Sequence, residues 1–123
     1  MSITGTYDAD NVFAMILRGE MPCARVYEDE NILAFMDVFP QSRGHTLVIP
    51  KTPSRNLLET HAKDVGRLFG TVQRIAKAVN SALTPDGIII TQFNGAPAGQ
   101  TVFHTHVHII PRYKNEPASE HVS

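Results

Sequence analysis

The chain has 123 residues, the size of one ordinary domain, and its 42% hydrophobic and 19% charged residues are typical of a globular protein. Its 11 basic residues against 12 acidic ones give no positive excess, so we expect no nucleic-acid partner. No apolar stretch approaches the roughly 20 residues of a membrane span, so we expect no membrane contact either.

Residues 1–123 are interpreted as a single domain with a loose C-terminal tail over residues 113–123. The single cysteine, Cys23, excludes an intramolecular disulfide and fits a reducing compartment. Asp8 and Asp10 precede the first apolar run, which is the opposite of the basic start of a secretion signal. We therefore expect a cytoplasmic protein.

The first predicted element is a short helix over Asn11 to Arg18, with Asp10 as its N-cap and Gly19 near its end. Three β-compatible runs follow, over residues 24–27, 32–37 and 46–49. The acidic segment between the first two runs predicts the turn of a hairpin. Apolar residues at spacings of three and four then predict a long helix from Ala62 to Val79.

A turn over Thr84 to Gly87 ends the long helix. Two more strands are predicted over residues 88–93 and 102–110, joined by a glycine-rich loop over residues 94–101. The order of elements favours an α+β fold: an antiparallel sheet of about five strands with one long and one short helix. Because such a sheet has open edges, we also expect a homodimer.

Three histidines, His104, His106 and His108, alternate with Thr105 and Val107 in the last predicted strand. Side chains alternate across a strand, so we expect the three imidazoles to share one face. Histidines satisfied within a core are one interpretation, although each buried ring needs a hydrogen-bond partner.

A metal site is a second interpretation, since imidazole is a common zinc ligand. His104 and His108 would begin about 13 Å apart on a straight strand, which is too far for all three rings to bind one ion. Cys23 and His45 are the candidates for further ligands. Phosphoryl chemistry is a third interpretation, because a neutral imidazole attacks phosphorus while its neighbours donate protons.

The sequence resembles the histidine triad (HIT) superfamily, and its Hint-like branch in particular. The segments that carry the resemblance are His104 to Ile110, Phe35 to Asp37, Pro40-Gln41, Gly44 to Lys51, Asn94 and Ala98 to Val102. Thr105 departs from the family pattern, in which an apolar residue is usual. Many bacterial members have a Cys-x-x-Cys pair that helps to hold zinc, and Asn11 to Ala14 replace it here. We therefore expect no metal and no other cofactor.

The resemblance implies that His106 attacks the α-phosphorus of a nucleotide and forms a nucleotidyl-histidine, which water hydrolyses. His104 and His45 would support this nucleophile, and Asp37 would hold the ribose. The resemblance also implies that the phosphate and the leaving group are held by Asn94, Gln100, Thr101 and His108. An apolar slot for the base would be lined by Ile16, Phe35 and Val38, although a simple core role suits these three equally well.

These expectations describe a nucleotidyl hydrolase acting on purine nucleoside 5'-phosphoramidates, with an AMP or GMP moiety in the site. One alternative is a hydrolase of dinucleoside polyphosphates. The other is a nucleotide-binding interaction module without catalysis.

Overall fold

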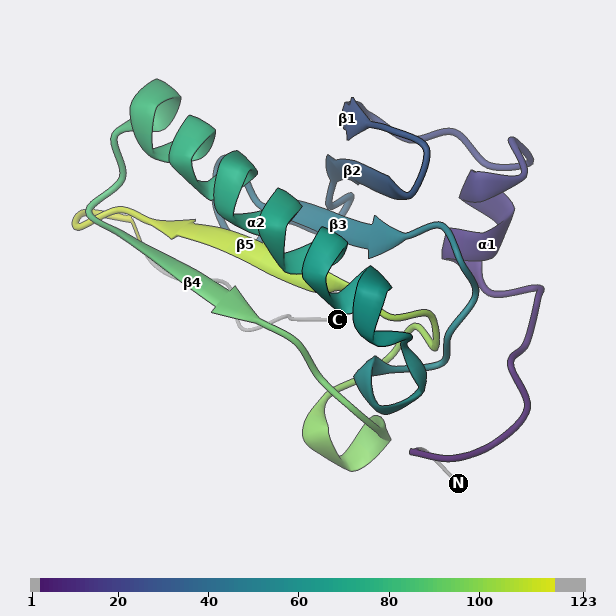
Figure 1. Cartoon of the computed structure of the whole chain (residues 1–123). Coiled ribbons are helices and arrows are strands. Elements are labelled where there is room, and N and C mark those ends of the chain that lie inside the picture. Colours follow the sequence, from purple (N-terminus) through teal and green to yellow (C-terminus); the bar gives the residue numbers. More distant parts are fainter. Residues whose placement is uncertain (1–2, 117–123) are drawn as a thin grey trace.

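A computed structural model describes residues 3–116 of the chain. Its helices are α1 (Val12–Leu17) and α2 (Ala62–Leu83), with short 3-10 turns η1 (Leu57–Glu59) and η2 (Ala96–Ala98). Its strands are β1 (Arg25–Glu28), β2 (Ile32–Met36), β3 (Thr46–Pro50), β4 (Gly87–Thr91) and β5 (Val107–Arg112). All five strands join one antiparallel sheet in the order β1-β2-β3-β5-β4, which confirms the predicted α+β architecture (Figure 1).

One face of the sheet is covered by α2, which lies across it in Figure 1. Leu68, Val72, Ile75 and Val79 of this helix form the main core with apolar side chains of β2, β3 and β5. The spacing of these four residues places them on one side of the helix, as the sequence predicted.

The opposite face of the sheet packs against α1. Phe13 and Ile16 of this helix join Leu33, Phe35 and Leu47 in a second core cluster. His108 pairs with Leu47 across β3 and β5, so its ring lies on this second face, while Val107 and Ile109 belong to the α2 core.

Two details of the predicted elements are wrong. The N-cap of α1 is Asn11 and not Asp10, because the Asn11 side chain accepts a hydrogen bond from the Ala14 amide at 3.0 Å. The last strand begins at Val107 and not at Val102. The chain before it is bound elsewhere, since the Thr105 amide donates to the Ser54 carbonyl at 2.9 Å. Of the three triad histidines, only His108 lies on the strand.

Most of the predicted loose tail lies outside the described residues. Its first part is attached to the loop before β3: the Tyr113 hydroxyl donates to the Arg43 carbonyl at 2.7 Å, and Arg43 lies 3.5 Å from the Glu116 carboxylate.

Gly44, in the loop before β3, has a backbone conformation that favours glycine. Its φ of +91° is one that L side chains rarely adopt, and an added Cβ would collide with the side chain of Leu83. We expect Gly44→Ala to lower the free energy of unfolding by about 2 kcal/mol or more. Gly66→Ala is the matched control, because a Cβ there meets no atom within 4 Å and α2 gains about 0.5 to 1 kcal/mol. Urea unfolding would measure both changes, and equal stability of the two variants would contradict this account.

Candidate active site

A cavity of about 260 Å³ lies between α1 and the end of β2. The three residues predicted for an apolar slot, Ile16, Phe35 and Val38, all line it, together with Asp37 and Thr101. Ile16 and Phe35 also belong to the second core cluster, so for these two the core and cavity interpretations both hold. Val38 is 77% exposed, which places it at the rim. The walls are mainly apolar, as is usual for small-molecule sites.

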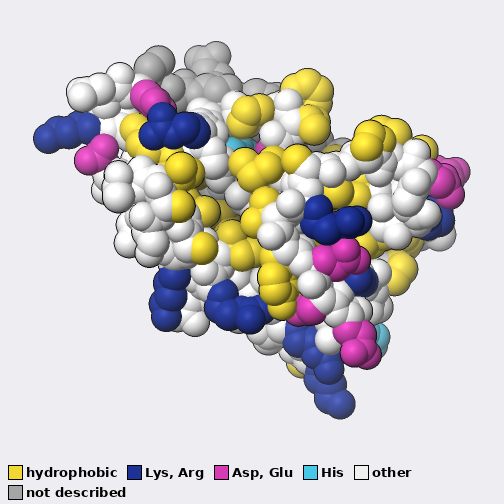
Figure 2. Space-filling view, turned by 90° about the horizontal axis from the view of Figure 1, so that it is seen from above, with side chains coloured by type: hydrophobic (Ala, Val, Ile, Leu, Met, Phe, Trp, Pro, Cys, Tyr) yellow, Lys and Arg dark blue, Asp and Glu magenta, His cyan; other side chains and the backbone are white. Residues whose placement is uncertain are grey.

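A larger groove of about 470 Å³ lies on the α2 side of the sheet, between β1 and the second half of the helix. Figure 2 shows hydrophobic side chains gathered across the middle of the face seen from above. Arg74 brings a charge to this groove, and no histidine or carboxylate is among its described lining residues. The smaller cavity also has no histidine among its described lining residues, but it has the Asp37 carboxylate, and one of its wall residues, Phe13, packs on a triad histidine.

The imidazole of His104 is fully buried and held at both nitrogens. Its Nε2 lies 2.8 Å from the Pro50 carbonyl oxygen, and its Nδ1 lies 2.6 Å from the Tyr7 hydroxyl. Burial lowers the pKa of His104, so the ring is neutral near pH 7. A carbonyl oxygen only accepts hydrogen bonds, so Nε2 carries the proton and Nδ1 accepts from Tyr7.

The ring of His106 is held by the backbone of His104. Its Nδ1 lies 2.7 Å from the His104 carbonyl oxygen and must donate to it, so the neutral ring has its lone pair on Nε2. The ring is only 2% exposed and packs edge-to-face on Phe13, whose side chain is part of the cavity wall. His106 thus lies directly behind the lining of the cavity, with its lone pair on Nε2, an atom that is itself buried.

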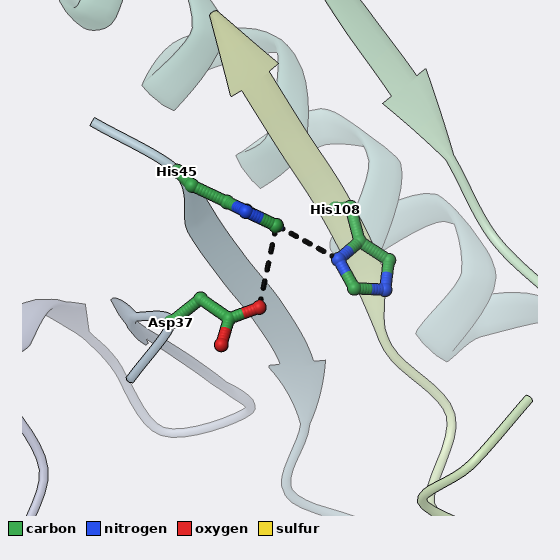
Figure 3. Close-up of side chains that lie close together, drawn as sticks. All are labelled: Asp37, His45 and His108. Carbon is green, nitrogen blue, oxygen red and sulfur yellow. Dashed lines mark hydrogen bonds and ion pairs between the residues drawn. The ribbon is translucent and has the colours of Figure 1, made fainter. Parts of the chain in front are cut away.

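A second chain of hydrogen bonds joins His45 to His108 (Figure 3). The backbone amide of Gln41 donates to His45 Nδ1 at 3.0 Å, so His45 Nε2 carries the proton of this ring. That Nε2 lies 2.9 Å from His108 Nδ1 and 3.4 Å from Asp37 Oδ2. Burial lowers the pKa of His45 to about 4, against the opposing effect of Asp37. His108 therefore accepts at Nδ1, and its own proton lies on Nε2.

The rings of His106 and His108 are neighbours, with centroids 5.1 Å apart. One offers a lone pair on Nε2 and the other a proton on Nε2. This pairing is what covalent phosphoryl transfer requires: a nucleophile beside a hydrogen-bond donor.

Asp37 lies at the edge of the cavity and is 8% exposed. Its Oδ1 accepts from the Phe39 amide at 2.9 Å, and its Oδ2 faces His45. The carboxylate is therefore fixed in orientation, while its predicted contact with a ribose stays a prediction.

The predicted phosphate-binding residues differ in their surroundings. Gln100 donates both amide hydrogens to the carbonyls of Arg55 and Val102, and its oxygen accepts from the Gly95 amide. Asn94 is likewise bonded to Gln92 and to the Leu57 amide. Both side chains therefore hold the backbone in and around the glycine-rich loop over residues 94–101. Thr101 differs, because it is exposed and lines the cavity.

The metal-binding interpretation gains one cluster, of which the sequence indicated His45 and His108 as candidate ligands but not Asp37. Donor atoms of Asp37, His45 and His108 lie within 4.8 Å of one another. The His45 and His108 nitrogens in that cluster already share a hydrogen bond, which an ion would have to break. Asn11 and Ala14 stand where the resemblance places a zinc-binding cysteine pair, but the Asn11 oxygen caps α1 and Ala14 has no donor side chain.

Several groups that hold the triad were missed by sequence reasoning. Two are backbone atoms, the Gln41 amide and the Pro50 carbonyl, and no residue type signals them. Tyr7 and Phe13 were also missed as site residues, because they lie about a hundred residues from the histidines and only folding brings them together.

Residues 18–115 match the family model described as the HIT domain. The chain belongs to the HIT family. It is 46% identical over 102 residues to the Protein hit of Bacillus subtilis, covering 83% of this chain and 70% of that protein. It is 42% identical to Adenylylsulfatase HINT3 of Arabidopsis thaliana, covering 92% of this chain but only 57% of that longer protein.

Solved structures of HIT proteins share the fold. A Hit-like protein of Bartonella henselae, described as involved in cell-cycle regulation and crystallised with an unknown ligand, superposes with a TM-score of 0.89 at 50% identity. The match covers 92% of this chain and 86% of that one. A zinc-bound histidine triad protein of Mycobacterium smegmatis gives a TM-score of 0.84 at 42% identity, covering 93% and 83% of the two chains. No helix within residues 3–116 is long and apolar enough to cross a membrane.

The lowered pKa of His45 makes stability depend on pH. The unfolded chain protonates this residue near its ordinary pKa of 6.5, whereas the folded chain keeps it neutral down to about 4. Stability from this group is therefore complete above pH 6.5 and falls by about 3 kcal/mol as the pH drops to 4. The lowered pKa of His104 acts in the same direction. We expect urea unfolding of His45→Gln to show a shallower loss over this range, and an unchanged slope would refute the assignment.

Proposed function

We propose that the protein is a nucleotidyl hydrolase that cleaves purine nucleoside 5'-phosphoramidates through a nucleotidyl-His106 intermediate. The observation that carries this proposal is the fixed pair of tautomers: a lone pair on His106 Nε2 beside a proton on His108 Nε2. Membership in the HIT family supports it independently.

In the first step, His106 Nε2 bonds to the α-phosphorus and the phosphorus–nitrogen bond breaks. Positive charge then develops on the His106 ring, where the Nδ1–H bond to the His104 carbonyl stabilises it. The leaving nitrogen takes up one proton from solvent, which is balanced by the proton that water releases in the second step. In the second step, water attacks phosphorus, releases one proton and restores the free ring. In the first step His108 Nε2–H donates a hydrogen bond to the leaving nitrogen.

The substrate's nucleoside would occupy the cavity beside α1. Its apolar walls suit a purine, and the oriented Asp37 carboxylate suits two ribose hydroxyls as hydrogen-bond donors. We assign the exposed Thr101 to the phosphate, whereas Asn94 and Gln100 would act by holding the loop that presents it. The Arabidopsis relative is named an adenylylsulfatase, which supports an adenylyl group in the site. The leaving group is to be identified by comparing substrates.

Turnover of adenosine 5'-phosphoramidate, diadenosine tetraphosphate and adenylyl sulfate would test the function and rank the leaving groups. We expect His106→Ala to lose turnover by at least about 10⁴-fold while it still binds AMP. His61→Ala is the matched control, because His61 is an exposed histidine at the start of α2. Mass spectrometry of the wild type mixed with substrate should find one nucleotidyl group on His106.

The result that would reject the hydrolase is a wild type that binds AMP but turns over none of the three substrates, which favours the interaction module. Loss of activity on dialysis against EDTA, restored by a metal ion, would instead assign a metal to the cluster of Asp37, His45 and His108.

We also propose that the protein forms a homodimer through β4. This edge strand reads Gly-Ile-Ile-Ile-Thr, and two of its isoleucines, Ile89 and Ile90, are 41% and 43% exposed. The other edge, β1, carries Arg25 and Glu28, and its pairing with β2 is irregular. Charges and bulges protect a sheet edge from pairing, so β4 is the edge open to a second copy.

Ile90→Lys places a charge on the β4 edge and should convert the dimer into a monomer of about half the mass. Val26→Lys makes the same change on β1, where Val26 is 47% exposed, and should leave the dimer intact. Light scattering after size-exclusion chromatography measures both. A monomeric wild type, or a dimer that survives Ile90→Lys, would contradict this interface.

A further inference from the structure

Tyr7 joins the N-terminal segment to the histidine triad. Its half-buried hydroxyl lies 2.6 Å from His104 Nδ1, across 97 residues of sequence. The two rings also meet edge-to-face, with centroids 5.7 Å apart. Neither the family match, which begins at residue 18, nor any sequence motif includes this tyrosine.

The direction of this hydrogen bond is fixed by the far side of the histidine ring. The Pro50 carbonyl oxygen can only accept, so His104 Nε2 carries a proton and donates a hydrogen bond to it. Burial lowers the pKa of His104 and raises the pKa of Tyr7, which keeps both groups neutral near pH 7. Tyr7 therefore donates to Nδ1, and the His104 ring is held at both ends.

The same residue, His104, sets the state of the nucleophile. Its carbonyl oxygen accepts from His106 Nδ1 at 2.7 Å, and Phe13 packs edge-to-face on both histidine rings. Because His104 lies before β5, strand pairing with a neighbour does not hold it. Its backbone is held through the next residue, because the Thr105 amide donates to the Ser54 carbonyl at 2.9 Å, and its ring is held by the bonds to Pro50 and Tyr7.

We propose that Tyr7 is a positioning residue for the nucleophile: its hydroxyl fixes the His104 ring and, together with the Thr105–Ser54 bond, holds the His104 carbonyl that keeps the proton of His106 on Nδ1 and its lone pair on Nε2. This inference rests on the hydrolase function proposed above. Without the hydroxyl, Nδ1 of a buried ring loses its donor, and the ring can turn to seek another.

Tyr7→Phe removes only the hydroxyl and keeps the edge-to-face packing. We expect kcat to fall by about 10- to 100-fold, with KM changed by less than about two-fold, as a small misplacement of a reacting group does. Tyr113→Phe is the matched control, because it also removes a hydroxyl that donates a hydrogen bond, in this case to the Arg43 carbonyl and not to a histidine ring. Its kcat should equal that of the wild type.

Imidazole ¹⁵N NMR separates positioning from general loss of structure. In the wild type, His106 should be protonated at Nδ1 alone. In Tyr7→Phe, the His106 signals should show a mixture of its two tautomers. If Tyr7→Phe lowers the melting temperature too far for assay, Tyr7→Gln, whose amide can donate to His104, should restore the His106 tautomer and part of kcat.

An unchanged kcat and an unchanged His106 tautomer in Tyr7→Phe would overturn the proposal. The NMR readout needs no turnover, so it tests Tyr7 even if none of the three nucleotides is a substrate. In that case the hydrolase assignment fails and the positioning of His106 is judged on its own.

Discussion

The site depends on one constraint: buried imidazoles must find hydrogen-bond partners, and here the main chain supplies them. The backbone carbonyls of Pro50 and His104 accept hydrogen bonds from two rings, and the backbone amide of Gln41 donates a hydrogen bond to a third. A carbonyl can only accept and an amide can only donate, so the backbone dictates which nitrogen of each ring is protonated. The chemical state of the cluster is therefore a property of the fold.

This constraint explains why the segment before β5 leaves the sheet. A continuous strand from residue 102 would commit its backbone to ladder bonds with its neighbours. Instead, the Thr105 amide bonds to Ser54, and the Thr105 hydroxyl meets the Ser54 hydroxyl at 2.7 Å. The polar side chain of Thr105 thus anchors the triad segment to the chain after β3.

The sequence was sufficient for the α+β architecture, and it named the histidines that the fold brings together, whose catalytic roles stay predictions. Periodicity identified α2, and alternation placed His108 opposite the α2 core. Through the family resemblance, the sequence also predicted an apolar slot lined by Ile16, Phe35 and Val38, and all three line the cavity. It could not place the start of β5, because β-propensity does not show which backbone bonds a segment makes with distant residues. The pairing of His45 with His108 and the contact of Tyr7 with His104 escaped for the same reason, since both join residues far apart in the chain.

Gly44 connects the architecture to this chemistry. It immediately precedes His45, and its bare α-carbon is the surface against which Leu83, the last residue of α2, and Pro111 of β5 close. The end of the long helix is consequently a mechanical stop for the loop that delivers His45 to its partners. The packing of α2 and the placement of His45 therefore share one contact, so a change at Gly44 or Leu83 acts on both faces of the sheet.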